Sequence, residues 1–366
     1  MGERGVVFVS CFRGVQRVAY TDAVEGTSTT AAPIAVVGAG SWGTALALHC
    51  ARRGFPVRLW SRNPEHAGAM QEQRRNPTYL SEFEFPAHLQ ATGELGEAVR
   101  GAQLVICAIP SHGMRAVVRS LAPSLVDGPP PLVLIASKGV EVDTMATMDA
   151  VLREELPEPL RDRVAALGGP SFAAEVAQGL PTTVVVAARQ AAVREAIQRM
   201  ISDHAVRAYE TEDVLGVELG GAFKNVIAIA AGIGDGAGLG QNARAGLITR
   251  GLAEISRLAV AVGAHPATLS GLAGMGDLVL TCTGGLSRNR RVGMALGRGQ
   301  SLDEILAEMG MVAEGVLNTK SAHRLAQREG VDMPIVAVMY AILYEGLAVP
   351  EAVDALMGRR LKAERG

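Results

Sequence analysis

Short apolar runs separated by glycine-rich or polar turns fill the first half of the chain. The runs that predict strands are 34–37, 56–60, 103–109, 132–136, 164–167 and 183–187. Between the first two, residues 44–53 have helical spacing and stop at Gly54. Continuous apolar runs of this length are typical of buried parallel strands, and their alternation with helices predicts βαβ units. After Asp213 the pattern changes to long Ala-, Leu- and Ile-rich segments with helical spacing, which predict a mostly α-helical second half.

Composition and charge exclude several classes of protein. The 366 residues include 35 Lys and Arg against 37 Asp and Glu, so a net charge of −2 offers no general attraction for nucleic acid or an anionic membrane. No apolar run approaches the roughly 18 residues that cross a bilayer. The four cysteines form no C-x-x-C motif, which predicts a reduced, cytoplasmic protein without a metal site. Glycine is frequent, 43 of 366 residues, and predicts many close approaches of the backbone.

The first predicted strand leads directly into the glycine motif G-A-G-S-W-G at 38–43. Between a strand and a helix, G-x-G-x-x-G is typical of a dinucleotide-binding turn. Gly38 permits the tight turn, Gly40 lets the backbone approach a pyrophosphate, and Gly43 lets the helix pack against the strand. The N–H groups at the start of the helix face the anion.

These features predict an α/β fold, in which an N-terminal Rossmann-type doubly wound sheet precedes an all-α C-terminal domain. We expect a loose extension over residues 1–31 and a dinucleotide-binding domain over 32–215. A helical domain is expected over 216–366.

The end of the second strand bears on the choice of cofactor. A carboxylate about 20 residues beyond the glycines would accept hydrogen bonds from an NAD ribose. The sequence there is L-W-S-R-N at 59–63, without an acid, and Arg62 offers a planar fork to a 2′-phosphate. NADP(H) is therefore favoured and NAD(H) remains possible, because Arg62 could equally be a solvated surface residue.

Two polar constellations mark the helical half. In E-L-G-G-A-F-K-N at 218–225, Lys224 stands above Gly220 and Gly221 on one helical face. It is either a functional lysine or one that reaches water beside glycines used in helix packing.

The second constellation comprises residues 274–283 and the segment S-R-N-R-R at 287–291. Its hydroxyls, amide and three arginines suit a phosphate, although arginine runs are also typical of solvated helix faces. Asp277 could equally be a helix cap.

Together these residues resemble the bacterial NAD(P)-dependent glycerol-3-phosphate dehydrogenases. The matching segments are G-A-G-S-W-G-T-A at 38–45, S-K-G at 137–139, G-P-S-F at 169–172, E-L-G-G-A-F-K-N at 218–225, G-D-L at 276–278 and S-R-N-R-R at 287–291. The resemblance extends from about Ile34 to Lys362, and the residues before Ile34 have no counterpart in it.

The resemblance implies interconversion of dihydroxyacetone phosphate and sn-glycerol 3-phosphate by hydride transfer, which supplies glycerol 3-phosphate for phospholipid synthesis. It makes the helical domain over 216–366 the substrate-binding and catalytic domain, with Lys224 as the catalytic acid/base. With the motif glycines Gly38, Gly40 and Gly43, the implied cofactor positions are Ser41, Trp42, Arg62, Lys138, Ala173, Arg288, Val312 and Glu314. The implied substrate positions are Lys138, Gly169, Ser171, Lys224, Asp277, Ser287, Arg288 and Asn289. The residue type at the position of Arg62 varies within the family.

Two alternatives stay open. A β-hydroxyacid or sugar-acid dehydrogenase would also couple a Rossmann domain to a helical one, with a different anion site for the substrate carboxylate. A non-enzymatic NADP-sensing module would bind the cofactor without turnover. A homodimer is expected from the frequency of dimers among soluble enzymes. We expect no nucleic-acid partner and no integral membrane association.

Overall fold

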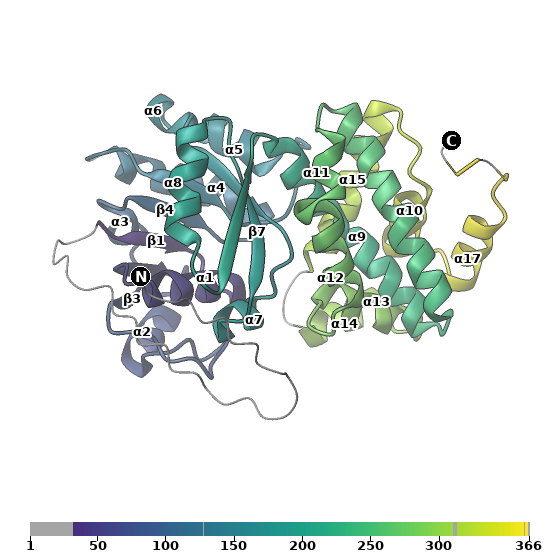
Figure 1. Cartoon of the computed structure of the whole chain (residues 1–366). Helices are drawn as coiled ribbons and strands as arrows, with labels where there is room; N and C mark the ends of the chain where they lie inside the picture. Colours follow the sequence, from purple (N-terminus) through teal and green to yellow (C-terminus); the bar gives the residue numbers. More distant parts are fainter. Residues whose placement is uncertain (1–31, 127, 310–312, 362, 365–366) are drawn as a thin grey trace, which may run out of the picture. The chain divides into compact units, whose positions relative to one another are not determined.

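The computed structural model describes residues 32–126, 128–309, 313–361 and 363–364, and the predicted extension over 1–31 lies outside them. The N-terminal domain, purple to teal in Figure 1, contains an eight-stranded sheet with the order β3-β2-β1-β4-β5-β6-β7-β8. The strands are β1 (Ile34–Val37), β2 (Val57–Trp60), β3 (Leu89–Thr92), β4 (Leu104–Cys107), β5 (Leu132–Ile135), β6 (Val164–Gly168), β7 (Thr182–Ala187) and β8 (Val206–Thr211). The first six are parallel and follow the Rossmann order, which confirms the predicted fold class.

All six predicted strands are present, and β3 and β8 are additional to them. Strand β3 has one fully buried residue, Leu89, so it lacks an apolar run. Strand β8 is an edge strand in which several side chains are exposed. Strand β7 runs antiparallel to β6, with Ala166 opposite Ala187, a reversal that periodicity does not reveal.

Helices cover both faces of the sheet. They are α1 (Ser41–Arg52), α2 (Pro64–Gln73), α3 (Leu95–Val99), α4 (Met114–Leu121), α5 (Met148–Glu155), α6 (Glu158–Arg161), α7 (Ala173–Gln178) and α8 (Ala191–Ile201). Helices α1, α7 and α8 pack on the face that carries Ile34 and Val36, and α3, α4 and α5 pack on the face of Ala35 and Val37. Helix α1 begins at Ser41, three residues before its predicted start, because Gly40 already serves as its N-cap.

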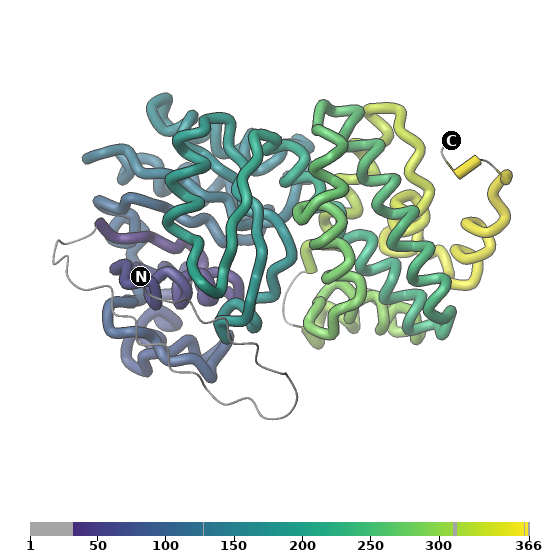
Figure 2. The backbone as a smooth tube through the Cα atoms, in the orientation of Figure 1, coloured from purple at the N-terminus to yellow at the C-terminus, as the bar shows by residue number. Residues whose placement is uncertain are grey.

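The C-terminal half consists of helices, green to yellow in Figure 2. They are α9 (Val214–Gly236), α10 (Gly240–Ala261), α11 (Pro266–Ser270), α12 (Asp277–Thr283), α13 (Arg288–Gly297), α14 (Leu302–Met309), α15 (Glu314–Glu329), α16 (Pro334–Tyr340) and α17 (Val349–Met357). Helix α9 is the centre of this domain and packs against α10, α12, α13 and α15.

Helix α9 corrects one expectation from the sequence. Its 23 residues are long and apolar enough to cross a membrane, whereas no run of that kind was expected. The helix is nevertheless 94% buried over its apolar window, where it forms the core of the helical domain. Burial within the protein therefore accounts for its apolar composition.

Helices α9 and α13 pack through glycines. Gly232 and Gly236 on α9 face Gly293 and Gly297 on α13, so each helix contributes two glycines one turn apart. A Cβ added at Gly232 would lie 2.1 Å from a carbonyl oxygen of α13, and one added at Gly293 would lie 2.0 Å from a carbonyl oxygen of α9. The two main chains are thus in direct contact, one of the close approaches that the glycine content predicts.

Candidate active site

The glycine turn after β1 forms an open surface rich in hydrogen-bond donors. Gly38 has φ +117°, and a Cβ there would lie 2.5 Å from the carbonyl oxygen of Ala108. A Cβ on Gly43 would lie 1.8 Å from the carbonyl oxygen of Gly38, whereas one on Gly40 would enter open space. No side chain caps α1, and the N–H groups of a first helical turn lack acceptors within their own helix. This arrangement fits a pyrophosphate group.

Three other predicted cofactor positions lie around this turn. The indole Nε1 of Trp42 donates to the carbonyl oxygen of Ala136 at 3.1 Å, which joins α1 to the end of β5. Ala173 is the first residue of α7 and is partly buried against the core of the sheet. Arg62 is exposed just after β2 and has no hydrogen-bond or ion-pair partner within the described part of the chain.

The carboxylate of Asp277 binds two lysines that come from different domains. Lys138, after β5, donates from Nζ to Oδ2 at 2.8 Å, and Lys224, on α9, donates from Nζ to Oδ1. Asp277 is 0% exposed and Lys224 6% exposed. Asp277 is the first residue of α12, yet its side chain is engaged by the lysines and does not cap the helix.

Thr281 completes this group; its hydroxyl belongs to the constellation at 274–283, but it was not among the predicted site residues. Lys224 Nζ donates to Thr281 Oγ1 at 2.7 Å, and that hydroxyl donates to the carbonyl oxygen of Asp277 at 2.6 Å. The four-residue spacing of Asp277 and Thr281 puts them on one helical face and is a signal that could have identified the threonine. An ammonium has three N–H donors, so Lys224 keeps one for a substrate oxygen.

The charges of the site are strongly coupled. Burial lowers the pKa of Lys224 to about 8, the Asp277 carboxylate opposes this shift, and the positive charge of Lys138 adds to it. Burial alone would raise the pKa of Asp277, but the two neighbouring ammonium groups outweigh it and keep that pKa below its ordinary value. The site therefore holds an ionised carboxylate and a lysine that exchanges its proton near neutral pH.

Lys138 also reaches the loop that follows β6. Its Nζ donates to the carbonyl oxygen of Gly169 at 3.2 Å, and Ser171 Oγ donates to the same oxygen at 3.1 Å. Gly169 has φ +100°, and a Cβ there would lie 3.1 Å from the backbone of Val184. The predicted substrate positions Lys138, Gly169 and Ser171 are thus adjacent.

The polar residues at the start of α13, which were predicted to suit a phosphate, make different contacts. Ser287 Oγ accepts from the N–H of Arg290 at 3.2 Å and caps the helix. The guanidinium of Arg290 binds Asp235 at 2.6 Å, so this arginine of the motif forms a structural ion pair. Arg288, the first residue of α13, is exposed.

Asn289 bridges two neighbouring segments. Its Nδ2 donates to Oδ1 of Asn225 at 2.9 Å, and its Oδ1 accepts from the N–H of Gly315 at 3.0 Å. Asn225 directly follows Lys224 on α9. The amide of Asn289 therefore connects the start of α13 to the helix of Lys224.

Glu314 at the start of α15 lies at the end of β4. Its Oε1 accepts from the N–H of Ser111 at 2.9 Å, and its Oε2 accepts from Ser111 Oγ at 2.7 Å. Ser111 follows the strand predicted over 103–109 and was not among the predicted site residues. Val312, the other predicted cofactor position in this region, lies outside the described residues.

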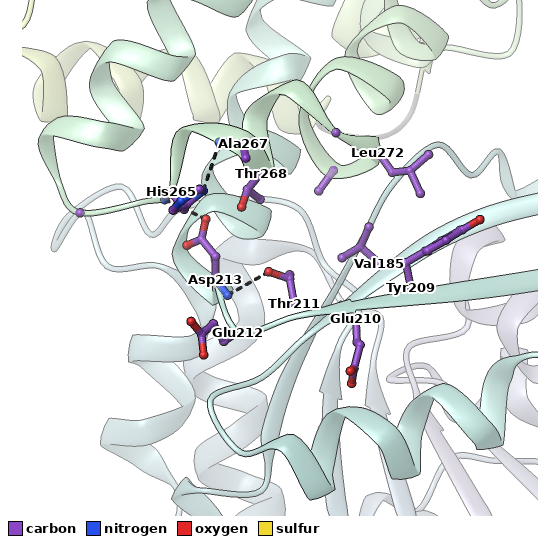
Figure 3. Close-up of a pocket in the computed structure, with 13 residues that line it drawn as sticks. Val185, Tyr209, Glu210, Thr211, Glu212, Asp213, His265, Ala267, Thr268 and Leu272 are labelled. Atoms are coloured by element: carbon purple, nitrogen blue, oxygen red, sulfur yellow. Dashed lines mark hydrogen bonds between the residues drawn. The ribbon is translucent and has the colours of Figure 1, made fainter.

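A cavity of about 720 Å³ lies apart from these side chains (Figure 3). Strands β7 and β8, helix α11 and the π-helical turn Leu272–Gly276 line it, and none of the predicted site residues does. Asp213 on its wall caps α9 through Gly216 N at 2.9 Å and accepts from His265 N at 2.9 Å. These contacts join the start of α9 to α11.

The small number of lysines in the chain is a sequence signal for this site. Only four of the 35 basic side chains are lysines: Lys138, Lys224, Lys320 and Lys362. Two of the four bind the same buried carboxylate. Burial can shift the pKa of a lysine, whereas an arginine stays charged. In a chain whose basic residues are mostly arginines, a lysine is therefore a candidate for proton transfer.

Comparisons with known proteins agree with this architecture. The family model described as NAD-dependent glycerol-3-phosphate dehydrogenase N-terminus matches residues 33–194, and the corresponding C-terminus model matches residues 213–354. A Citrifermentans bemidjiense protein named glycerol-3-phosphate dehydrogenase (NAD(P)+) is 52% identical over 331 residues, 90% of this chain and 98% of that protein. A protein of the same name from Geobacter metallireducens is 53% identical over 334 residues, 91% of this chain and 99% of that protein.

A solved structure supports the same assignment. The crystal structure of glycerol-3-phosphate dehydrogenase from Coxiella burnetii matches with a TM-score of 0.85 and 40% sequence identity, covering 90% of this chain and 100% of that chain. Both halves of the sequence and the three-dimensional fold therefore match the same family. The chain belongs to the NAD-dependent glycerol-3-phosphate dehydrogenase family.

Proposed function

We propose that the protein interconverts dihydroxyacetone phosphate and sn-glycerol 3-phosphate with a nicotinamide dinucleotide. The observation that carries this proposal is the Lys138–Asp277–Lys224 group, in which Asp277 and Lys224 are buried, at the carboxyl edge of the sheet that also carries the glycine turn of α1. Family membership favours this reaction over that of a β-hydroxyacid dehydrogenase or a sensing module. The product would serve phospholipid synthesis.

Lys224 is the proposed acid/base. When bound, the nicotinamide supplies or accepts the hydride. During reduction, negative charge grows on the carbonyl oxygen, and the Lys224 ammonium stabilises this charge with its remaining N–H and then transfers the proton. Asp277 and Thr281 hold the ammonium in place, and Lys138 keeps its pKa close to the working range.

The proposed cofactor site uses the glycine turn and the ends of the strands. Gly38, Gly40, Ser41, Trp42 and Gly43 would hold the pyrophosphate side, and Lys138, Ala173, Arg288, Val312 and Glu314 complete the set. NADP(H) is the preferred cofactor, supported by the exposed Arg62 and the lack of a carboxylate at 59–63. NAD(H) would bind without the contribution of Arg62.

The phosphate of the substrate is proposed to bind at the start of α13. Arg288 would supply charge-assisted hydrogen bonds, Asn289 would present an N–H beside Lys224, and Ser287 would contribute its hydroxyl. Gly169, Ser171 and Asp277 would line the carbonyl end with the lysines. Binding the phosphate there would align the carbonyl carbon for hydride transfer.

The remaining assignments concern the context of the enzyme. We propose a cytoplasmic homodimer with no nucleic-acid partner. The proposed domain boundary near residue 215 is supported by the end of β8 at Thr211 and the start of α9 at Val214.

The test is the absorbance of the reduced nicotinamide in the presence of dihydroxyacetone phosphate. Wild-type protein is expected to oxidise NADPH, and Lys224→Ala should lower kcat roughly 100-fold or more while cofactor binding is retained. Lys320→Ala is the matched control, because Lys320 lies over the ring of Tyr344 and outside the site. Wild-type protein without turnover would refute the proposed function, and near-normal turnover of Lys224→Ala would refute the role of the lysine.

A further inference from the structure

The amide of Asn318 links the two backbone segments that carry the site lysines. Asn318 is on α15 and is 0% exposed. Its Nδ2 donates to the carbonyl oxygens of Lys138 at 3.3 Å and Ala222 at 3.0 Å, and its Oδ1 accepts from the N–H of Val140 at 3.4 Å. Ala222 precedes Lys224 by two residues on α9. One side chain therefore contacts the loop of the first lysine and the helix of the second.

Two further residues on the same face of α15 contact this edge of the sheet. Glu314, Asn318 and Ser321 are spaced by four and three residues, so they lie along one side of the helix. Ser321 Oγ donates to the carbonyl oxygen of Val140 at 3.1 Å, and Glu314 binds Ser111. Helix α15 thus fastens the ends of β4 and β5 to the helical domain.

The loop after β5 has little room to move. A Cβ on Gly139 would lie 2.4 Å from Ser111 Oγ and 3.0 Å from Oε2 of Glu314. On both sides of Gly139 the backbone is bonded to Asn318. A buried amide costs free energy unless it is hydrogen-bonded. The bonds to the Lys138 loop and to α9 satisfy the buried amide of Asn318.

We infer that Asn318 is a positioning residue, which fixes the separation of the Lys138 and Lys224 ammonium groups around Asp277. The inference rests on the proposed function, because it assigns a task within the site where Lys224 acts. Without the amide, α15 no longer holds the Lys138 loop beside α9. The Lys138 ammonium then lies farther from Lys224 and repels it less.

Moving Lys138 away from Lys224 changes the pKa of Lys224 in a definite direction. The charged and titratable groups that face Lys224 are Asp277, Lys138 and Cys282. Burial is the main cause of the lowered pKa of Lys224, and Lys138 adds to it. Moving Lys138 away therefore raises the pKa of Lys224 above about 8.

The experiment compares Asn318→Leu with Thr319→Val. Thr319 is also 0% exposed, and its hydroxyl donates only within its own helix, to Gly315 at 2.7 Å. In Asn318→Leu, kcat for dihydroxyacetone phosphate should fall roughly 10- to 100-fold. The alkaline midpoint of reduction should rise, which a merely structural change at position 318 would not cause. Thr319→Val should leave the midpoint and kcat unchanged.

A second measurement does not depend on turnover. Competitive acetylation of the lysines over a pH series, read by mass spectrometry, reports the titration of Lys224, with Lys320 as an internal reference. The Lys224 midpoint should rise in Asn318→Leu and rise less in Ser321→Ala, the variant to use if Asn318→Leu does not fold.

An unmoved Lys224 midpoint in the folded variants would overturn the inference, as would an equal shift in Thr319→Val. A raised midpoint in a protein that does not turn over dihydroxyacetone phosphate would support the positioning role and refute the proposed function instead.

Discussion

Ser111 donates two hydrogen bonds to the carboxylate of Glu314, from its N–H at 2.9 Å and its hydroxyl at 2.7 Å, across 203 positions of sequence. Ser111 follows β4 and Glu314 begins α15, so the pair joins the two domains at the carboxyl edge of the sheet.

Ser111→Ala should weaken cofactor binding, because Glu314 loses the hydroxyl that orients it. Ser111 is buried, so water does not readily replace its hydrogen bond to the carboxylate, and we expect a loss of about 1.5 kcal/mol, roughly tenfold in the Kd for NADPH. Tryptophan fluorescence titration measures it. Ser120→Ala is the control, since Ser120 Oγ donates only to Ala116 in its own helix. Equal affinities of wild type and Ser111→Ala would contradict the role of this pair.

The pH dependence of the two directions should be opposite. Lys224 must be protonated to donate during reduction, and its pKa is lowered to about 8, chiefly by burial. Reduction of dihydroxyacetone phosphate should therefore decline as the pH rises through about 8, whereas oxidation of glycerol 3-phosphate should increase. Initial rates at saturating cofactor between about pH 6 and 10 measure both limbs. Parallel profiles for the two directions would exclude Lys224 as the titrating group.

Arg62→Ala should discriminate between the two cofactors. If Arg62 binds the 2′-phosphate, its removal costs roughly 1.5 to 3 kcal/mol for NADPH, about 10- to 150-fold in affinity, and little for NADH. Titration of both cofactors against wild type and variant gives the ratio. Arg58→Ala is a matched control, because its guanidinium binds backbone oxygens of Glu97 and Arg100. Equal losses for NADPH and NADH would reject this role for Arg62.

Arg288→Lys tests the phosphate contact. The substitution retains the charge but loses the planar fork, so kcat/KM for dihydroxyacetone phosphate should fall. Dihydroxyacetone, which lacks the phosphate, should be a poor substrate for both proteins and insensitive to the change. Arg291→Lys, on the exposed side of the same helix, is the control. A similar decrease for both substrates would assign Arg288 to the cofactor or to folding.

Glu218→Gln should reduce the pH dependence of stability. Burial, assisted by the nearby Asp149 carboxylate, raises the pKa of Glu218 from 4.5 to about 8. The neutral form is favoured in the folded state, so its contribution is complete below about pH 4.5 and is lost as the pH rises to about 8. Wild type should lose roughly 1 kcal/mol or more between these limits relative to Glu218→Gln.

Guanidinium unfolding at several pH values measures this difference. Glu212→Gln, at an exposed position, is the control and should retain the wild-type dependence. The same pH slope in wild type and Glu218→Gln would contradict the prediction.

The local pattern of apolar residues and glycines predicts most of the fold but less of the site. The β1–α1–β2 unit follows from an apolar run, a glycine motif and helical spacing, which are all properties of neighbouring residues. Strand β3 and the antiparallel direction of β7 depend on partners elsewhere in the sheet, so no local period encodes them.

The same limit applies to the site. Lys138 and Asp277 are 139 residues apart, and the packing of α9 against β6 and α12 brings them to 2.8 Å. The resemblance named both residues without indicating their contact. Thr281 was accessible from its helical spacing, whereas Asn318 was not, because its partners lie on two other segments.

The contact of α9 and α13 through glycines fixes the spacing of the two helices. Side chains at a helix interface can exchange rotamers and absorb small shifts, whereas touching main chains cannot. The distance between Lys224 on α9 and the start of α13 is therefore fixed by the backbone contact of the two helices. For a phosphate anchored at the start of α13, this fixed spacing would set how far from the phosphate the carbonyl that Lys224 contacts must lie.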